Sequence, residues 1–354
     1  IEGHTLKLVG PGTATITASQ AGNEFYNAAA SVSQDITLEE PLAGQERLFI
    51  TLPHGSSNGS GSVVSLHPDG SNVNIRPMGA NEGTYPVAAL TYYDGAFYGT
   101  TQSGGRYGVG TIYRVNADGS EFYTLHHFDG SNSGALPWAK LLAASDGYLY
   151  GTTVNGGSNN VGVAFRIYPD GTHFQKLFDF GGANGVYPYG SLLEGQDGYV
   201  YGTTYSGNGS YGTIFKLAKD GTAYLKLHDF NSVNGAYPHS GLVQDAQGKL
   251  FGTTYHGYNG SSNYSTIYSI NSDGSAFTVL AYLNGGNGQN ILSPLLIGAD
   301  GILYGTAHSG GAYNTGTIFK INRDGTGFAM LYTFGSSNSD SRHPGYSGLI
   351  SLSN

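Results

Sequence analysis

Short apolar segments separated by glycine-rich turns run along most of the chain. Residues 187–230 show the pattern, with four successive segments, "YPYGSLLEGQDG", "YVYGTTYSGNGS", "YGTIFKLAKDG" and "TAYLKLHDF". Each segment is rich in Tyr, Val, Ile, Leu and Thr, and glycine punctuates every junction, which is typical of antiparallel strands joined by turns. The pattern predicts a unit of four antiparallel strands, here called strands A to D in chain order.

The unit recurs six times. An Asp-Gly turn joins strands C and D in each copy, and successive turns are 49 to 53 residues apart, at Asp69, Asp118, Asp170, Asp220, Asp273 and Asp324. Repeats of about 50 residues with four strands each are typical of β-propeller blades. The sequence therefore predicts an all-β, six-bladed β-propeller with four-stranded antiparallel blades over residues 47–354. Because Asp-Gly suits two-residue hairpins, we expect φ > 0 at both central residues of these turns.

The count of turns predicts where the ring closes. Turns between strands A and B occur only five times, at Asp94, Asp146, Asp197, Gln247 and Asp300. Residues 47–78 supply strands B, C and D of one blade, and we expect the segment "HPGYSGLISL" at 343–352 to supply its strand A. The C-terminal strand then joins the N-terminal blade, and no strand edge is left exposed.

The first 40 residues differ in pattern from the repeats. Thr, Ile and Val alternate with small residues, as in half-buried strands, and "GTATITASQAGN" with the later "VSQDITL" resembles the closing strands of bacterial immunoglobulin-like domains. A complete domain of that kind has about 100 residues. The resemblance implies the end of a truncated domain at 1–40, a linker at 41–46 and a longer protein upstream. The alternative is a strand pair that packs against the repeats.

The two ends of the strands are expected to differ in function. Antiparallel strands reverse direction, so the long B-to-C and D-to-A loops emerge on one face and the tight turns on the other. The long loops vary between copies and are rich in Tyr, Asn, Ser and His. Loops carry binding and catalysis more often than scaffolds do, so we expect function on the long-loop face.

Composition narrows the class of partner. The 354 residues include 58 glycines, 28 tyrosines and no cysteine, and 24 acidic against 15 basic residues give a net charge of −9. Nucleic acid is disfavoured because no basic stripe is present to neutralise phosphates. No apolar stretch approaches the roughly 20 residues of a membrane span, and thiol chemistry is excluded. We expect a monomeric body within a larger multidomain chain.

The repeats resemble a named family. The segments "FYGTTQSGGRYGVGTIYRVNADG", "YVYGTTYSGNGSYGTIFKLAKDG" and "ILYGTAHSGGAYNTGTIFKINRDG" are similar to the tandem GloVer repeat of bacterial surface proteins. The resemblance covers about residues 47–354, and the first copy departs most, with "LFITLPHG" in place of the usual Tyr-Gly-Thr-Thr. It implies secretion and display at the bacterial cell surface, and it brings no catalytic residues to this chain.

Positions that recur in every copy favour a structural role. The Tyr-Gly-Thr-Thr motif starts at Tyr98, Tyr150 and Tyr201, with variants at Phe251 and Tyr304. A residue present in nearly every blade is expected to pack blade against blade. The glycine-rich loops lack a P-loop lysine, and there is no nucleophile elbow, HExxH motif or EF-hand spacing. We therefore predict no metal and no cofactor.

Positions where the copies differ are better candidates for a binding site. Just after the proline that opens strand A stand Val87, Trp138, Tyr189, His239, Leu292 and, allowing one extra residue, Tyr346. The position before the proline adds Tyr85, Tyr187, Tyr237 and His343. Aromatic rings around a channel mouth suit stacking on sugar rings. The alternative, that they plug the channel, is favoured for the tyrosines before proline, and the binding role is favoured for Trp138.

Charged candidates are few. Lys140 stands where the other copies have Ala89, Ser191, Gly241, Pro294 and Gly348. A cation there could bind a uronate carboxylate or act as a base, or it is simply a solvated lysine. Asp129 and Asp340 form the only plausible carboxylate pair for glycoside hydrolysis. His239, Tyr189 and Lys140 are the candidates for a polysaccharide lyase, which uses a base beside a cation.

Three functions from different classes remain open at this point. The leading hypothesis is a secreted or surface-displayed propeller that binds a polysaccharide or other glycan. The second is a propeller enzyme that degrades polysaccharide, either a lyase or a glycoside hydrolase. The third is a structural or adhesive module that binds another protein. Low charge and scattered acids favour binding over catalysis.

Overall fold

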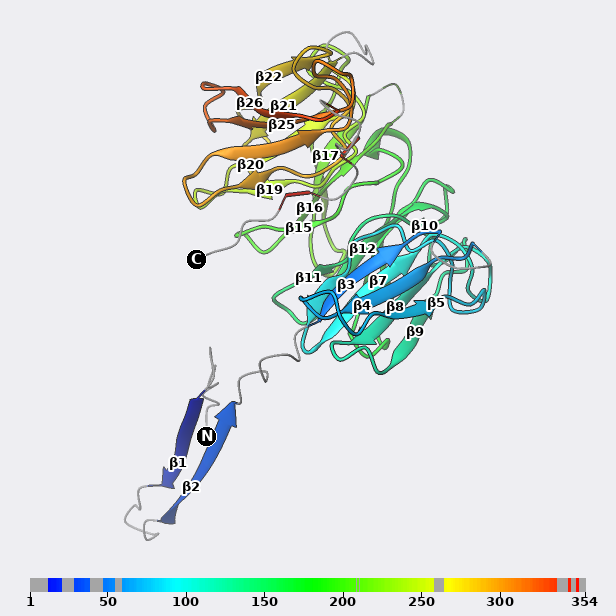
Figure 1. Ribbon diagram of the computed structural model, residues 1–354, viewed down its shortest axis with the longest axis vertical. Coiled ribbons are helices and arrows are strands. Elements are labelled where there is room, and N and C mark those ends of the chain that lie inside the picture. The colour runs from blue at the N-terminus through cyan, green and yellow to red at the C-terminus, as the bar shows by residue number, and fades with distance from the viewer. Residues whose placement is uncertain are drawn as a thin grey trace. The chain divides into compact units, whose positions relative to one another are not determined.

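In the computed structural model the regular secondary structure is almost entirely β-strand (Figure 1). It describes residues 12–20, 29–38, 47–54, 59–207, 209, 211–257, 264–335, 343–344 and 348–349. Within these ranges lie 26 strands and one short 3-10 helix, η1 (Gly182–Asn184). No helix of the described part is long and apolar enough to cross a membrane.

The repeats form a series of antiparallel sheets. Three sheets after the first copy hold four strands in chain order, β6(Thr91–Tyr93)-β7(Ala96–Thr101)-β8(Thr111–Asn116)-β9(Phe122–His127), β15(Leu193–Glu194)-β16(Val200–Thr204)-β17(Thr213–Leu217)-β18(Tyr224–Asp229) and β19(Val243–Gln244)-β20(Leu250–Thr254)-β21(Tyr264–Ile270)-β22(Thr278–Asn284). A fourth sheet is β23(Leu296–Ile297)-β24(Leu303–Ala307)-β25(Thr317–Ile321)-β26(Ala329–Thr333). The all-β class and the four-stranded antiparallel unit are thereby confirmed.

The remaining sheets vary this plan. The third copy has five strands, because β10(Ala135–Pro137) and β11(Leu142–Ala143) both pair with β12(Leu149–Asn155), followed by β13(Val163–Ile167) and β14(Gln175–Asp179). The first copy has three, β3(Leu48–Leu52), β4(Ser62–Leu66) and β5(Asn74–Pro77), which match the predicted strands B, C and D. Most of the predicted closing strand, 343–352, lies outside the described residues.

The chain divides into two compact units, residues 1–49 with 65–74 and residues 50–64 with 75–354. The first unit contains β1(Gly12–Gln20) and β2(Ala29–Leu38), which form an antiparallel pair. The second contains the sheets from β6 to β26. The domain boundaries predicted at residues 40 and 46 fall among residues that the structure does not describe, so they stay predictions.

Buried clusters fill the spaces between consecutive sheets of the larger unit. In one of them, Tyr150 and Leu177 of the third copy pack with Val200 and Phe215 of the fourth. Corresponding clusters lie between the sheets on either side. Burial of each such side chain stabilises the fold by about 1.5–3 kcal/mol. These clusters therefore stabilise the packing of each sheet against the next one in the sequence.

The Tyr-Gly-Thr-Thr motif builds these interfaces. The ring of Tyr201 is fully buried, and its hydroxyl donates to Asp197 Oδ2 at 2.6 Å. The glycine is needed because a Cβ on Gly202 would lie 2.5 Å from Phe215 Cζ. The Thr203 hydroxyl donates to the Ser240 carbonyl of the next copy at 3.1 Å. The next threonine, Thr204, donates to the carbonyl of Ser206 in its own loop at 3.1 Å.

The Asp-Gly turns differ from the predicted geometry. Only Asp94 and Gly95 have φ > 0 at both positions, 45° and 75°. In the turn at Asp170 only the glycine has φ > 0, at 86°. Tyr168 O accepts from Gly171 N–H, and Tyr168 N–H donates to Thr172 O, both at 2.9 Å. This is a three-residue hairpin with a glycine bulge. It forms because the Asp170 carboxylate accepts the Thr172 N–H at 2.8 Å.

Strand A is shorter than the sequence pattern predicts. It spans two or three residues, such as Leu193–Glu194, and not the whole segment that begins at the proline. The residue before that proline has φ near +58°, as at Tyr85 and Tyr237. A left-handed residue followed by proline interrupts a strand, and among the described sheets only that of β12 has a separate short strand, β10, at this position. The residues between the proline and strand A are therefore free of ladder pairing.

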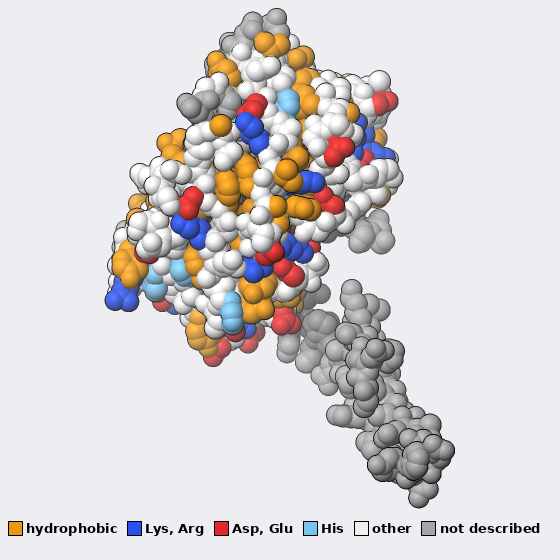
Figure 2. All heavy atoms as spheres, turned by 180° about the vertical axis from the view of Figure 1, so that it is seen from behind, with side chains coloured by type: hydrophobic (Ala, Val, Ile, Leu, Met, Phe, Trp, Pro, Cys, Tyr) orange, Lys and Arg blue, Asp and Glu red, His pale blue; other side chains and the backbone are white. Residues whose placement is uncertain are grey.

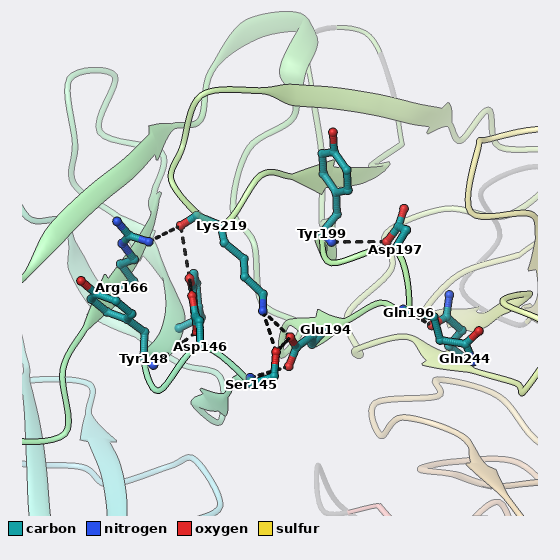
Figure 3. A network of polar contacts seen from close by, with 11 residues as sticks. Ser145, Asp146, Tyr148, Arg166, Glu194, Gln196, Asp197, Tyr199, Lys219 and Gln244 are labelled. Carbon is teal, nitrogen blue, oxygen red and sulfur yellow. Dashed lines mark hydrogen bonds and ion pairs between the residues drawn. The ribbon is translucent and has the colours of Figure 1, made fainter. Parts of the chain in front are cut away.

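Polar contacts cross between sheets near the A-to-B turns (Figure 3). Lys219 forms an ion pair with Glu194 and donates to Ser145 Oγ at 3.0 Å. Ser145 lies in the preceding sheet's turn and donates its hydroxyl to Glu194 Oε1 at 2.5 Å. Arg166 donates to the Lys219 carbonyl at 3.0 Å. The charged side chains of this polar network thus form their contacts within the protein.

Candidate functional site

A cavity of about 360 Å³ gathers the same short segment from five sheets. In each copy these residues lie between the proline and strand A. The lining consists of Val87, Ala88, Ala89, Trp138, Ala139, Lys140, Tyr189, Gly190, Ser191, His239, Ser240, Gly241, Leu292, Pro294, Gly348 and Leu349. We call it the five-sheet cavity. Positions more than 200 residues apart in the sequence therefore meet at one site.

Small residues allow these segments to approach closely. A Cβ on Gly190 would lie 2.5 Å from the Ser240 carbonyl oxygen, and one on Gly241 would lie 2.6 Å from Ser191 Oγ. The backbones of adjacent copies thus touch at this level. Larger side chains are accommodated only where they turn toward the cavity, as Trp138 and Tyr189 do.

Three aromatic side chains from consecutive sheets form a row in the lining. The Trp138 and Tyr189 ring centroids are 5.7 Å apart with the planes at 88°, an edge-to-face contact. Tyr189 stacks on His239 with centroids 4.6 Å apart and planes at 15°. Burial lowers the pKa of His239 to about 4. The imidazole is therefore neutral at neutral pH, and the row is an uncharged aromatic surface.

A second set of aromatics continues from this row into the B-to-C loops. Tyr205 contacts Tyr189 at 5.5 Å and His239 at 6.1 Å, and Tyr255 lies 6.3 Å from His239. The sequence analysis missed Tyr205 and Tyr255. The available signal was their position directly after Tyr-Gly-Thr-Thr, where the other copies have Gln102, Val154 and His308. The position after Tyr-Gly-Thr-Thr therefore varies between copies, as does the position after the proline. Both variable positions lead to the same site.

Lys140 is the one charged residue in this lining as far as the described residues go. It is exposed, and its counterparts Ala89, Ser191, Gly241, Pro294 and Gly348 line the same cavity. The predicted grouping of Lys140 with His239 and Tyr189 is thus present in the structure. Whether these residues bind a ligand stays a prediction.

The residues before the proline do not line the cavity. Tyr85, Tyr187, Tyr237 and His343 all have φ between 55° and 59°. Their N–H groups donate to carbonyls of the preceding copy, for example Tyr187 to Val161 at 2.9 Å. The same φ occurs at Leu136 and Asn290, so the position is defined by the backbone rather than by the side chain. Only Tyr237 approaches the site, through a stacking contact with Tyr205 at 4.9 Å.

Of the two predicted carboxylates, Asp129 is not among the described residues that line the cavity. Asp129 belongs to the D-to-A loop, where it accepts from the Asn132 and Ser133 N–H groups at 2.9 and 2.8 Å. Although partial burial opposes ionisation, these hydrogen bonds lower the pKa of Asp129 to about 2. Its carboxylate thus organises its own loop. Asp340 and Tyr346 lie outside the described residues.

No group of three or more His, Asp and Glu side chains in the described ranges is arranged to hold a metal ion.

Figure 2 shows one face of the molecule, on which acidic and basic side chains are interspersed and hydrophobic ones gather over the middle. No broad patch of one sign is seen on that face.

A larger hollow of about 630 Å³ lies between two neighbouring sheets. Its lining includes Asp94, Tyr98, Arg114 and the turn at Pro169–Thr172. It opens where the A-to-B turn is one residue shorter, as the pairing of Thr91 with Tyr98 shows against that of Leu142 with Tyr150. The hollow lies beside a single turn that is one residue shorter. The five-sheet cavity, in contrast, is lined by the variable position of five copies. The latter is the better candidate site.

Comparison with known proteins identifies the repeats and supports the fold. The model of the Gloeobacter/Verrucomicrobia repeat matches residues 37–259, which confirms the GloVer resemblance. No curated protein matches the sequence.

Solved structures similar to this chain are β-propeller-like and distant in sequence. Oligogalacturonate lyase in complex with manganese has a TM-score of 0.54 at 13% identity, over 95% of this chain and 87% of the lyase. The extracellular domain of a one-component system protein from B. thetaiotaomicron has a TM-score of 0.53 at 14% identity, over 84% of this chain and 37% of that one. TolB from Acinetobacter baumannii has a TM-score of 0.48 at 13% identity, over 82% and 64%. The chain thus spans less than two thirds of the last two proteins.

Proposed function

The chain belongs to the Gloeobacter/Verrucomicrobia repeat family, and we propose that it is a secreted or surface-displayed module that binds a polysaccharide in the five-sheet cavity. The row formed by Trp138, Tyr189 and His239 carries this proposal. Uncharged aromatic faces stack on the apolar faces of sugar rings, and the Ser191 hydroxyl in the same lining can hydrogen-bond a sugar hydroxyl. Nucleic acid is not the proposed partner, since the net charge is −9.

The single tryptophan provides the experiment. Trp138 is the only tryptophan in the sequence, so its fluorescence reports directly on the cavity. Titration with a panel of oligosaccharides is expected to shift that emission. The Tyr189→Leu variant keeps the probe and removes its ring neighbour, and its affinity should fall about tenfold, since aromatic contacts are worth about 0.5–1.5 kcal/mol beyond burial.

A matched control separates the site from general surface effects. Tyr313 is 55% exposed and lies outside the cavity lining, so Tyr313→Leu should bind like the native protein. No emission change with any oligosaccharide, combined with capture of a protein ligand, would favour the third hypothesis of an adhesive protein-binding module.

The finer fold proposal is a closed ring of six blades. Gly348 and Leu349 line the five-sheet cavity beside their counterparts from five copies, which supports a sixth strand A there. Leu331 is 50% exposed, whereas the equivalent Leu177 and Leu227 pack into core clusters against the following sheet. Ring closure would supply the missing neighbour. Deletion of residues 343–354 should therefore abolish cooperative unfolding, and an unchanged melting transition would exclude this closure.

A polysaccharide lyase is the second candidate function. Burial lowers the pKa of His239 to about 4, which keeps the imidazole unprotonated at neutral pH but makes it a weak base, and Lys140 lines the same cavity. Oligogalacturonate lyase shares the fold, at 13% identity. A lyase would release unsaturated products that absorb in the ultraviolet, and binding without such products would leave the module non-catalytic. Glycoside hydrolysis has less support, since Asp129 is committed to its loop.

A further inference from the structure

The five-sheet cavity contains a cation with no carboxylate beside it. Lys140 is the charged member of the lining, and no Asp or Glu is among the described lining residues. Six other Lys and Arg side chains in the described ranges form ion pairs with carboxylates, namely Arg76, Lys176, Lys216, Lys219, Lys226 and Arg323. Lys140 forms none with any described residue. Its charge is therefore available to a ligand.

The position of Lys140 is as specific as its charge. It lies two residues after Trp138 in the same segment, which corresponds to about 6–7 Å along an extended chain. The counterparts in the other copies are small or apolar, so no second long side chain at this register competes for the space. A sugar ring on Trp138 would thus have one cation within reach of its substituents.

The net charge of the protein is opposite in sign to the charge of Lys140. The net charge is −9, which repels anionic polymers at long range. At physiological salt the Debye length is about 8 Å, so a cation inside the cavity dominates over distant acidic residues. Neighbouring His239 stays neutral and adds no charge of its own.

We infer that the five-sheet cavity selects an anionic glycan, with Lys140 bound to a carboxylate or sulfate group on the sugar that stacks on Trp138. This inference rests on the proposed glycan-binding function and specifies its ligand class. The lysine is a specificity residue, because the aromatic row supplies contact to any sugar and the ammonium group distinguishes charged sugars from neutral ones.

The test compares charged and neutral forms of the same backbone. Trp138 fluorescence and calorimetry are recorded with oligogalacturonate, with its neutral methyl ester and with a sulfated galactan oligosaccharide. Lys140→Ala should weaken binding of the preferred anionic oligosaccharide about tenfold or more, the effect of losing a charged hydrogen bond. It should leave the neutral ester unchanged. Lys140→Arg should keep part of the affinity, because the charge remains.

Lys226→Ala is the matched control. It removes the same charge from the outer strand β18, where Lys226 pairs with Asp229, and it should bind like the native protein. Added salt should weaken anionic binding by the native protein but not by Lys140→Ala. Preference for oligogalacturonate or for the sulfated galactan supports charge selection and identifies the anionic group.

Two results contradict the inference, and they are distinguishable. If neutral and anionic forms bind equally, or if Lys140→Ala equals Lys226→Ala, charge selection is wrong while glycan binding stands. If none of the three oligosaccharides, nor any of the wider panel, alters Trp138 emission or releases heat, the proposed function fails and the inference fails with it.

Discussion

The Asp-Gly turns and the five-sheet cavity are made from the same repeat, yet they treat polar groups in opposite ways. In the C-to-D turns each carboxylate is used internally, as Asp170 accepts the Thr172 N–H and hydroxyl at 2.8 and 2.7 Å. Lys219, Glu194 and Ser145 likewise satisfy one another across two sheets. In the cavity, Lys140 has no such partner among the described residues.

The difference follows from what repetition can specify. A position that must pack against the next copy is fixed in every copy, because each sheet meets a similar neighbour. A position that faces the shared cavity meets no neighbouring core, so its side chain is free to differ. Repeated residues should therefore govern stability, and variable residues such as Trp138 should govern binding. The following variants test this division, from the largest expected effect on stability to the smallest.

Removal of a repeated aromatic should have the largest effect. Tyr201 is fully buried between two copies and bonds to Asp197 Oδ2 at 2.6 Å. Tyr201→Ala should lower the free energy of unfolding by about 3–5 kcal/mol, because it leaves a large cavity. Chemical denaturation measures the loss.

Tyr201→Phe is the control for that variant. Phe251 occupies the equivalent position in the next copy and is also fully buried. The ring is kept and one hydrogen bond is lost, so the expected cost is about 1 kcal/mol. Equal costs for the two variants would show that the hydroxyl, and not the packing, determines the interface.

Acid should destabilise the interfaces through a partly buried histidine. His228 stacks on Phe277 with ring centroids 3.8 Å apart, and burial lowers its pKa to about 4, with nearby Asp229 opposing the shift. The unfolded chain, with a pKa near 6.5, binds the proton more readily between pH 6.5 and 4. Stability is therefore lost as pH falls through this window, by at most about 3 kcal/mol for this residue.

The equivalent residue of the previous copy supplies the test. Phe178 stacks on Tyr224 at 4.0 Å in the same arrangement. His228→Phe should keep the packing and flatten the part of the pH dependence that His228 causes. Melting temperatures recorded from pH 7 to pH 4 compare the two proteins, and parallel curves would contradict the assignment.

The polar network near the turns should contribute less. Lys219→Ala removes the ion pair with Glu194 and the hydrogen bond to Ser145. Because the pair is only partly buried, the expected loss is about 1 kcal/mol. Partial burial raises the pKa of Glu194, but the bonds from Lys219 and Ser145 outweigh it and hold the pKa below its usual range. Their contribution should therefore disappear as pH falls below about 4, and oligosaccharide binding at neutral pH should not change.

The strand order was predictable because it depends on repetition. Tyr150, Tyr201 and the glycines that follow them recur at one spacing, and that spacing determines which sheets pack together. The turn geometry was not predictable from the dipeptide alone. Asp170 and Asp94 precede glycine alike, but a carboxylate bond to Thr172 and a longer turn give Asp170 a different backbone from that of Asp94.

The site was predictable only in part for a related reason. Register analysis places Trp138, Tyr189 and His239 at equivalent positions, and the structure brings them together. It also places Tyr187 beside them in sequence, but φ of 59° separates that residue from the cavity. The left-handed position before the proline is occupied by side chains of different types. The pattern of tyrosines in the sequence could therefore not reveal this backbone conformation.

Replacement of a variable residue should have the smallest effect on stability and the clearest effect on binding. Leu292 occupies the Trp138 position in the sixth copy and lines the same cavity. Trp138→Leu should therefore change the free energy of unfolding by less than about 1 kcal/mol, while calorimetric oligosaccharide binding weakens at least tenfold. A variant that unfolds like Tyr201→Ala would place Trp138 among the packing residues, and the division between repeated and variable positions would not hold at this site.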